Sequence, residues 1–241
     1  MIPLYDTEKA GKRAYVTWSL IAVNLAVFVG ELVWTSGLQP CKAEQLFYSL
    51  GLVPYSIIHG TVLSLNCVTG QLTPTGNAPA AYFTLLSSLF LHAGYLHVGG
   101  NMLFLFVFGD NIEARFGRLK FLVAYFAAGF AGSAAVLGAA MAAGGDALII
   151  PGLGASGAIS GVMAAYLVLY PSSRVISIVG YFVMPVRALW FIGFWFFLQV
   201  FFQVAGLDTG VSYVAHVAGF LIGLLAAFLV RSLDPNPEPA L

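Results

Sequence analysis

Six apolar segments dominate this sequence, and each is long enough, or nearly long enough, to cross a lipid bilayer as a helix. They occupy residues 14–34, 95–112, 120–142, 154–170, 186–205 and 211–230. The hydrocarbon core of a bilayer needs about 20 helical residues. Only 8% of the residues are charged and 60% are hydrophobic, whereas soluble domains carry about three times as many charges. We therefore predict an all-α polytopic membrane protein with six transmembrane helices.

The basic residues between the segments predict how the chain is oriented. Cytoplasmic connections retain Lys and Arg, and one orientation places nine of the ten basic residues in the cytoplasm and leaves Lys42 outside. The nine are Lys9, Lys12, Arg13, Arg115, Arg118, Lys120, Arg174, Arg187 and Arg231. Both termini are then cytoplasmic: residues 1–13 and a tail over 232–241 flank a membrane domain over 14–231. The net charge is zero, which argues against nucleic-acid binding.

A long connection over residues 35–94 lies on the outer side in this orientation. Its mixture of turn residues and apolar stretches predicts short helices at the membrane interface. Cys41 and Cys67 both fall within it. An oxidising compartment would permit a disulfide between them, and two unpaired thiols are an equally acceptable alternative.

The fourth segment is unusually short. A helix over 154–170 would span roughly 25 Å, less than a hydrocarbon thickness of about 30 Å. Its outer end would therefore begin below the membrane surface, and the irregular stretch before it would dip into the bilayer. Such backbone is tolerated there only where protein or a water-filled cavity surrounds it.

Four polar residues are expected at a common depth in the outer halves of the second, fourth and sixth segments: His97, Asn101, Ser156 and His216. Polar groups inside membrane helices are costly and mark candidate functional sites. His97 and Asn101 are four residues apart, so they share one helix face. His92 is expected in the loop above, where a hydrogen bond to the backbone and an accessory role are equally plausible.

Glycines flank the serine and follow the last histidine. Gly154 opens the fourth segment, Gly157 and Gly161 form one GxxxG motif, and Gly219 and Gly223 form a second, just after His216. Small residues four apart let two membrane helices approach closely. If the two motifs pack together, Ser156 and His216 come within reach of each other.

A serine, a histidine and hydrogen-bond donors are the components of acyl transfer. Serine needs an adjacent base to become a nucleophile, and neutral histidine suits this task. Asn101, the His97 ring N–H and the backbone N–H of Ser156 are candidate donors to an oxyanion. No Asp or Glu falls in the outer halves of the second to sixth segments. We therefore predict a Ser156/His216 dyad without a third, acidic member.

Three sequence elements resemble the signatures of rhomboid intramembrane serine proteases. They are GASG with Ser156, HAGYLHVGGN with His97 and Asn101, and AHVAGFLIG with His216. The stretches MIPLYDTE, FGDNIEARFG and PSSRV also resemble bacterial members. The similarity extends from the first residues to about Arg231.

This resemblance implies a six-helix rhomboid-like bundle in the bacterial inner membrane. It implies that Ser156 is the nucleophile, His216 the base and acid, and that His97, Asn101 and the Ser156 N–H form the oxyanion hole. The implied substrates are single-span membrane proteins, cut within or near the outer part of the bilayer. Neither a metal nor an organic cofactor is implied, and the oligomeric state is left open.

One position departs from the family pattern. Some rhomboids carry a tyrosine four residues after the nucleophile, which supports the catalytic histidine, but this chain has Ser160. We expect Tyr213 to give that support instead, and Ser160 to bond back to a helix carbonyl.

The main alternative function is that of a catalytically inactive rhomboid-like protein that binds membrane clients. Such proteins typically lose the serine or the histidine, and both are present here. A metal site from His92, His97 and His216 is disfavoured because HExxH is absent. A transporter would show broken helices in an inverted repeat, and we find no such repeat.

Overall fold

The computed structural model describes residues 1–8, 10–11, 13–207 and 210–233. These residues form two compact units. The C-terminal unit comprises Met1–Ile21, Gly100–Gly132 and Ser156–Leu241, and the loop unit comprises Ala22–Gly99 and Ser133–Ala155. Three parts of the topology prediction lie outside the described residues: Lys9, Lys12 and the tail from 234 onward.

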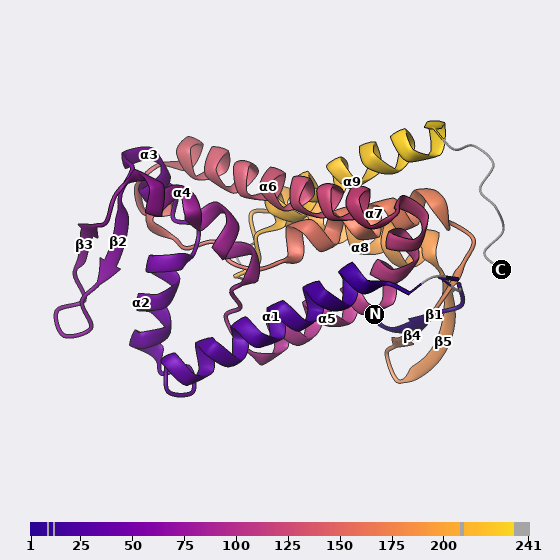
Figure 1. The fold of residues 1–241 in the computed structure, drawn as a ribbon, viewed down its shortest axis with the longest axis horizontal. Helices are drawn as coiled ribbons and strands as arrows, with labels where there is room; N and C mark the ends of the chain where they lie inside the picture. Colours follow the sequence, from indigo (N-terminus) through magenta and orange to yellow (C-terminus); the bar gives the residue numbers. More distant parts are fainter. Residues whose placement is uncertain (9, 12, 208–209, 234–241) are drawn as a thin grey trace. The chain divides into compact units, whose positions relative to one another are not determined.

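An apolar helix occupies each of the six segments predicted to cross the membrane (Figure 1). Three are long and apolar enough to do so: α1 (Tyr15–Trp34), α6 (Arg118–Ala143) and α9 (Tyr213–Leu233). Helix α5 (Tyr95–Phe116) qualifies only together with the segment before it, as a single span bent by 74°. That segment consists of α4 (Ala78–Ser87) and the 3₁₀ turn η1 (Ser88–Phe90). Two are apolar but shorter: α7 (Ser156–Leu169) and α8 (Ala188–Val204). The described residues thus contain three helices of spanning length, or four with the bent pair, where the sequence predicts six.

Helix α5 ends at Phe116, beyond the predicted end at residue 112, because polar groups in its last turns are buried and bonded. Glu113 is only 2% exposed and accepts hydrogen bonds from the backbone N–H groups of Val16 and Thr17 at 2.9 and 2.7 Å. N–H groups in the first turn of a helix lack partners within that helix. The Glu113 carboxylate therefore caps α1 at the end where the helix dipole favours a negative charge.

The connection over 35–94 contains short helices, as predicted, and a β-hairpin that the sequence analysis did not predict. The helices are α2 (Pro40–Leu50), α3 (Pro54–His59) and α4, and the hairpin strands are β2 (Val62–Leu65) and β3 (Leu72–Thr75). A further 3₁₀ turn, η2 (Gly145–Ile149), lies against α3. Cys41 and Cys67 form a disulfide with their Cα atoms 5.7 Å apart, so the alternative of two unpaired thiols is wrong. Closing a loop between residues 26 apart is worth about 3.5 kcal/mol in the chain-entropy account.

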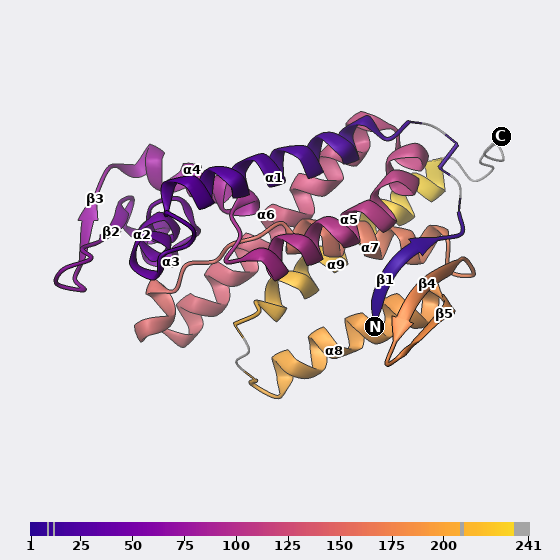
Figure 2. The ribbon, with the colours of Figure 1, turned by 90° about the horizontal axis from the view of Figure 1, so that it is seen from below.

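A three-stranded antiparallel sheet in the C-terminal unit corrects the all-α prediction (Figure 2). Its strands, in the order β1-β4-β5, are β1 (Ile2–Asp6), β4 (Arg174–Val179) and β5 (Phe182–Arg187). The run VISIV in β4 is rich in β-branched residues, and the turn into β5 passes through Gly180 with φ +61°. Both are hairpin signals, overlooked because the run is short and lies between two apolar helices.

Asp6 on β1 links this sheet by hydrogen bonds to α5 and α7 of the same unit. Its carboxylate accepts a hydrogen bond from the side-chain amide of Asn111 at 2.9 Å and another from the hydroxyl of Tyr166. Burial is the largest influence and raises the pKa of Asp6 from 3.8 to about 6, while the Tyr166 hydrogen bond acts in the opposite direction. The folded state therefore favours the neutral carboxyl more than the unfolded chain does.

We expect the free energy of unfolding to decrease between about pH 4 and pH 7. A carboxyl whose pKa is raised by folding gives its full contribution below pH 3.8 and loses it as the pH passes about 6. Asp6 is only partly buried, so we expect about 1–2 kcal/mol and not the ~3 kcal/mol of the whole shift. Denaturation in detergent at several pH values measures this. Asp6→Asn should flatten the dependence of the unfolding free energy on pH. The control Asp146→Asn, at an exposed position in η2, should leave it unchanged. Equal slopes for wild type and Asp6→Asn would contradict the prediction.

Candidate active site

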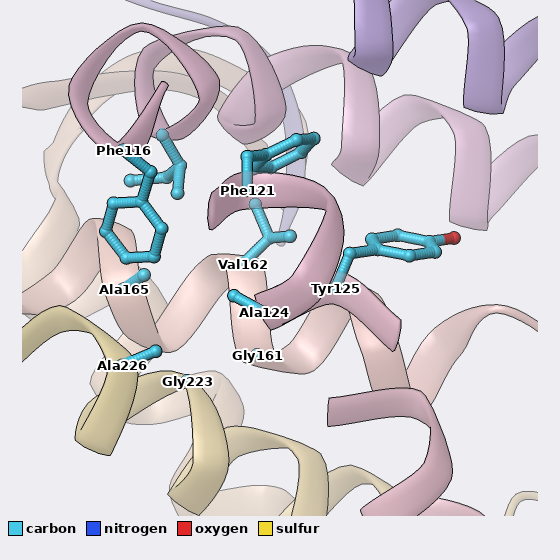
Figure 3. Close-up of a pocket in the computed structure, with 10 residues that line it drawn as sticks. Phe116, Phe121, Ala124, Tyr125, Gly161, Val162, Ala165, Gly223 and Ala226 are labelled. Atoms are coloured by element: carbon cyan, nitrogen blue, oxygen red, sulfur yellow. The ribbon is translucent and has the colours of Figure 1, made fainter. Parts of the chain in front are cut away.

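The two GxxxG motifs meet in the C-terminal unit, where α7 and α9 pack with their backbones in contact. A Cβ atom added to Gly219 would lie 2.0 Å from the carbonyl oxygen of Gly157, and one added to Gly223 would lie 2.0 Å from that of Gly161. Figure 3 shows the ribbons of both helices side by side at Gly161 and Gly223. We call these four residues the glycine seam. Only glycine permits so close an approach at Gly219 and Gly223.

Helix α6 also reaches this contact. A Cβ atom on Gly132 would lie 3.1 Å from the carbonyl oxygen of Ala215, and one on Gly157 would lie 3.5 Å from the same oxygen. Ser156 directly precedes Gly157, and His216 directly follows Ala215. Each of the two predicted catalytic residues therefore adjoins the same backbone contact.

A small cavity of about 10 Å³ lies farther along the seam. Its lining is almost entirely apolar: Ile112, Phe116, Phe121, Ala124, Tyr125, Gly161, Val162, Ala165, Gly223 and Ala226. In Figure 3 the hydroxyl of Tyr125 points away from this space. The cavity is about the size of one water molecule, so it is a gap in helix packing and no substrate site.

Ser156 is the first residue of α7, and it is partly exposed. The prediction that this helix begins at Gly154 is wrong, because Gly154 has φ +111°, a value that no helical residue adopts and that glycine tolerates. The backbone N–H of Ser156 consequently lies at a helix N-terminus. Such N–H groups are available to hydrogen-bond an anion.

Ser160, the other serine on this turn, has the structural role predicted for it. Its hydroxyl donates a hydrogen bond of 2.6 Å to the backbone carbonyl of Ser156. The residue is 1% exposed. Its hydroxyl is thus directed at the helix backbone.

His216 is buried on α9, and a residue that the sequence analysis missed contacts its ring. Nδ1 of His216 lies 2.8 Å from the side-chain oxygen of Gln199 on α8. The ring of Trp195 also packs against His216, with centroids 5.7 Å apart. Tyr213, the expected support, packs its ring on Phe202 at 5.3 Å. The signal for Gln199 is a lone amide in the apolar run FWFFLQV, which must find a hydrogen-bond partner if buried.

Asn101 and His97 both lie on α5, one turn apart. Asn101 is 8% exposed in the C-terminal unit. His97 belongs to the loop unit, where its Nδ1 accepts a hydrogen bond of 3.3 Å from the backbone N–H of Ala93. A neutral imidazole that accepts at Nδ1 carries its hydrogen on Nε2. His97 therefore presents an Nε2–H donor.

His92 lies in the loop before α5 and is held by backbone groups. Its Nδ1 is 3.1 Å from the carbonyl oxygen of Phe90, and its ring makes an edge contact with His97 at 5.0 Å. The backbone N–H of His92 donates to the Glu31 carboxylate at 3.1 Å. Glu31 is only 3% exposed, so it fixes this loop from inside the loop unit.

The irregular stretch before Ser156 makes three backbone hydrogen bonds to the segment 52–88 of the loop unit. Leu52 and Gly152 exchange two backbone hydrogen bonds of 2.9 and 2.8 Å, and the N–H of Gly154 donates to the carbonyl of Ser88 at 2.8 Å. Within the described residues, no group of three or more His, Cys, Asp or Glu side chains is arranged to hold a metal ion.

A model of the Rhomboid domain matches residues 79–233, more than half of the chain. The chain belongs to the rhomboid family. The matched range contains Ser156, His216 and Gln199 and leaves out α1. The family match and the apolar helices together show that the chain is an integral membrane protein.

Individual rhomboids from a fungus, a plant and a bacterium are similar to this chain. Rhomboid protein 1, mitochondrial, of Saccharomyces cerevisiae is 31% identical over 152 residues, which cover 61% of this chain and 41% of the yeast protein. RHOMBOID-like protein 6, mitochondrial, of Arabidopsis thaliana is 30% identical over 90% of this chain and 69% of its own length. Rhomboid protease AarA of Providencia stuartii is 23% identical over 87% of this chain and 70% of its own length. The chain thus spans less than half of the yeast rhomboid.

Proposed function

We propose that this rhomboid is an intramembrane serine endopeptidase that cleaves single-span membrane proteins within or near the outer part of the bilayer. The observation that carries the proposal is the glycine seam, because Ser156 and His216 each adjoin a backbone contact between α7 and α9. A nucleophile and its base need this proximity. Family membership and the protease names of relatives such as AarA agree with it.

The chemistry assigned to these residues is acyl transfer. His216 removes the proton of the Ser156 hydroxyl as its oxygen attacks the scissile carbonyl, and returns that proton to the leaving amine. A water molecule then hydrolyses the acyl-enzyme with His216 again as the base. The charge that develops on the carbonyl oxygen is stabilised by the backbone N–H of Ser156, the Asn101 amide and the Nε2–H of His97. No step in this scheme requires a metal or an organic cofactor.

The same proposal includes the topology. Six helices form the membrane domain, and both termini are cytoplasmic. The Cys41–Cys67 disulfide supports an outer location for the 35–94 connection, since disulfides persist in oxidising compartments. The inner membrane of a bacterium fits this arrangement.

The direct test is cleavage of a tagged single-span membrane protein by the purified chain in liposomes. We expect a product whose new terminus, located by mass spectrometry, maps within or just outside the membrane segment of the substrate. A fluorophosphonate probe should label the protein in the same preparation, because the probe reacts with activated serines. Absence of both cleavage and labelling across a panel of single-span substrates would favour a client-binding protein without activity and would overturn the proposal.

A further inference from the structure

The imidazole of His216 is bonded to an amide side chain from a neighbouring helix. Nδ1 of His216 and Oε1 of Gln199 are 2.8 Å apart, and the two residues are 8% and 7% exposed. Both belong to the C-terminal unit. An amide buried in an apolar helix is costly unless its polar atoms are bonded. The contact therefore has a defined geometry with little competition from water.

A second hydrogen bond fixes which end of the amide faces His216. The side-chain nitrogen of Gln199 lies 3.0 Å from the backbone carbonyl of Trp195, one turn earlier on α8. A carbonyl oxygen can only accept, so the NH₂ group must face Trp195. The amide oxygen consequently faces His216. Amide orientation is assigned from such networks, and here each atom has one consistent role.

The amide oxygen in turn determines the tautomer of His216. Because Oε1 of Gln199 can only accept, Nδ1 of His216 must carry the hydrogen. In the neutral imidazole the lone pair is then on Nε2. A general base for serine needs its lone pair on the nitrogen directed at the hydroxyl, and the wrong tautomer abolishes most of the activity.

We propose that Gln199 is a positioning residue that holds His216 in the Nδ1–H tautomer, so that Nε2 serves as the base. This inference rests on the proposed function, in which His216 takes the proton of Ser156. Gln199 thereby fills the place that a carboxylate has in a triad, and it does so without burying a charge in the bilayer. Trp195 contributes twice, through its backbone carbonyl to Gln199 and through its ring against His216.

The tautomer can be measured on the wild-type protein without any substrate. The chain has four histidines, so ¹⁵N-histidine labelling gives four imidazoles, and comparison with His216→Gln assigns the signals of His216. In neutral His216 we expect a protonated Nδ1 and an unprotonated Nε2. A hydrogen on Nε2 would overturn the proposal whether or not the protein proves to be a protease.

Kinetics of two substitutions test the role in catalysis. Gln199→Leu removes the acceptor with little change in volume, and we expect kcat to fall about 10- to 100-fold while KM stays nearly constant. Gln199→Glu keeps an oxygen acceptor and should recover most of kcat. Its negative charge favours the protonated imidazole, so the acid limb of its pH–rate profile should move to higher pH.

Gln203→Leu is the matched control, since Gln203 lies one turn later on α8 and is exposed. It should retain wild-type kcat and the wild-type pH profile. Equal losses in Gln199→Leu and Gln203→Leu, or wild-type kcat in Gln199→Leu, would overturn the positioning role. If the wild type cleaves no substrate, the proposed protease function fails, and the tautomer measurement still decides the inference about Gln199.

Discussion

Replacing Ser156 with alanine is expected to lower kcat for substrate cleavage by more than about 10³-fold. The substitution removes only the hydroxyl oxygen that would attack the scissile carbonyl, and alanine fits the first turn of α7. His216→Ala should cause a loss of similar size, because a serine without its base is a poor nucleophile. The double variant should lose no more than either single one, since residues that act as a unit are not additive.

Ser160→Ala is the control for this experiment. The Ser160 hydroxyl is bonded to the carbonyl of Ser156, and its removal should leave kcat near the wild-type value. Fluorophosphonate labelling should follow the same pattern, present in wild type and Ser160→Ala and absent in Ser156→Ala. Undiminished cleavage by Ser156→Ala would assign the activity to another residue or to a contaminant.

Replacing Gly219 with alanine is expected to destabilise the protein by at least ~3 kcal/mol and to lower kcat at least ~100-fold. The new Cβ would lie 2.0 Å from the carbonyl oxygen of Gly157, and because this obstacle is backbone, the two helices must separate. Overpacking of this kind typically costs ~1–3 kcal/mol where side chains can move. A displacement of about 1 Å between catalytic groups reduces rates by about 10²-fold. Chemical denaturation and the cleavage assay measure the two effects.

Two further glycine substitutions separate stability from catalysis. Gly223→Ala meets an equally close backbone atom, the carbonyl oxygen of Gly161, one turn farther from His216. It should lose stability as Gly219→Ala does, with a smaller loss of kcat in the folded fraction. Gly193→Ala on α8 has nothing within 4 Å of its added Cβ, so it should be neutral or slightly stabilising. A Gly219→Ala variant with wild-type stability would show that the seam is looser than described.

The sequence predicted the positions of the apolar helices well, because hydropathy depends only on local composition. It predicted neither the three-stranded sheet nor the β2–β3 hairpin. The strands of β1, β4 and β5 are short, and β1 pairs with β4 across more than 160 residues. The pairing of β1 with β4 has no local signal, although β4 and its turn into β5 carry the hairpin signals described above. The bounds of α5 and α7 were also predicted wrongly. Helix α5 extends past residue 112 because Glu113 accepts hydrogen bonds from α1. Helix α7 begins after Gly154 because that residue has a positive φ.

In the candidate site, motif and spacing are sufficient to single out Ser156, His216 and the glycines. The support of His216 could not be predicted in this way. Gln199 lies 17 residues before His216 on another helix, and its part depends on how α8 is rotated against α9. The aromatic sequence around it suggests a helix exposed on one side, and Phe194 and Phe197 are exposed, whereas Gln199 lies on the buried side.

In the proposed topology, the disulfide between Cys41 and Cys67 lies on the outer side of the membrane. Both cysteines precede the range that matches the rhomboid domain, so the bond can close while later helices are still being synthesised. Disulfides form and persist mainly in oxidising compartments. A molecule inserted the opposite way would keep two thiols in a reducing one. In the proposed topology, the redox state of this pair would therefore report which way each molecule had entered the membrane.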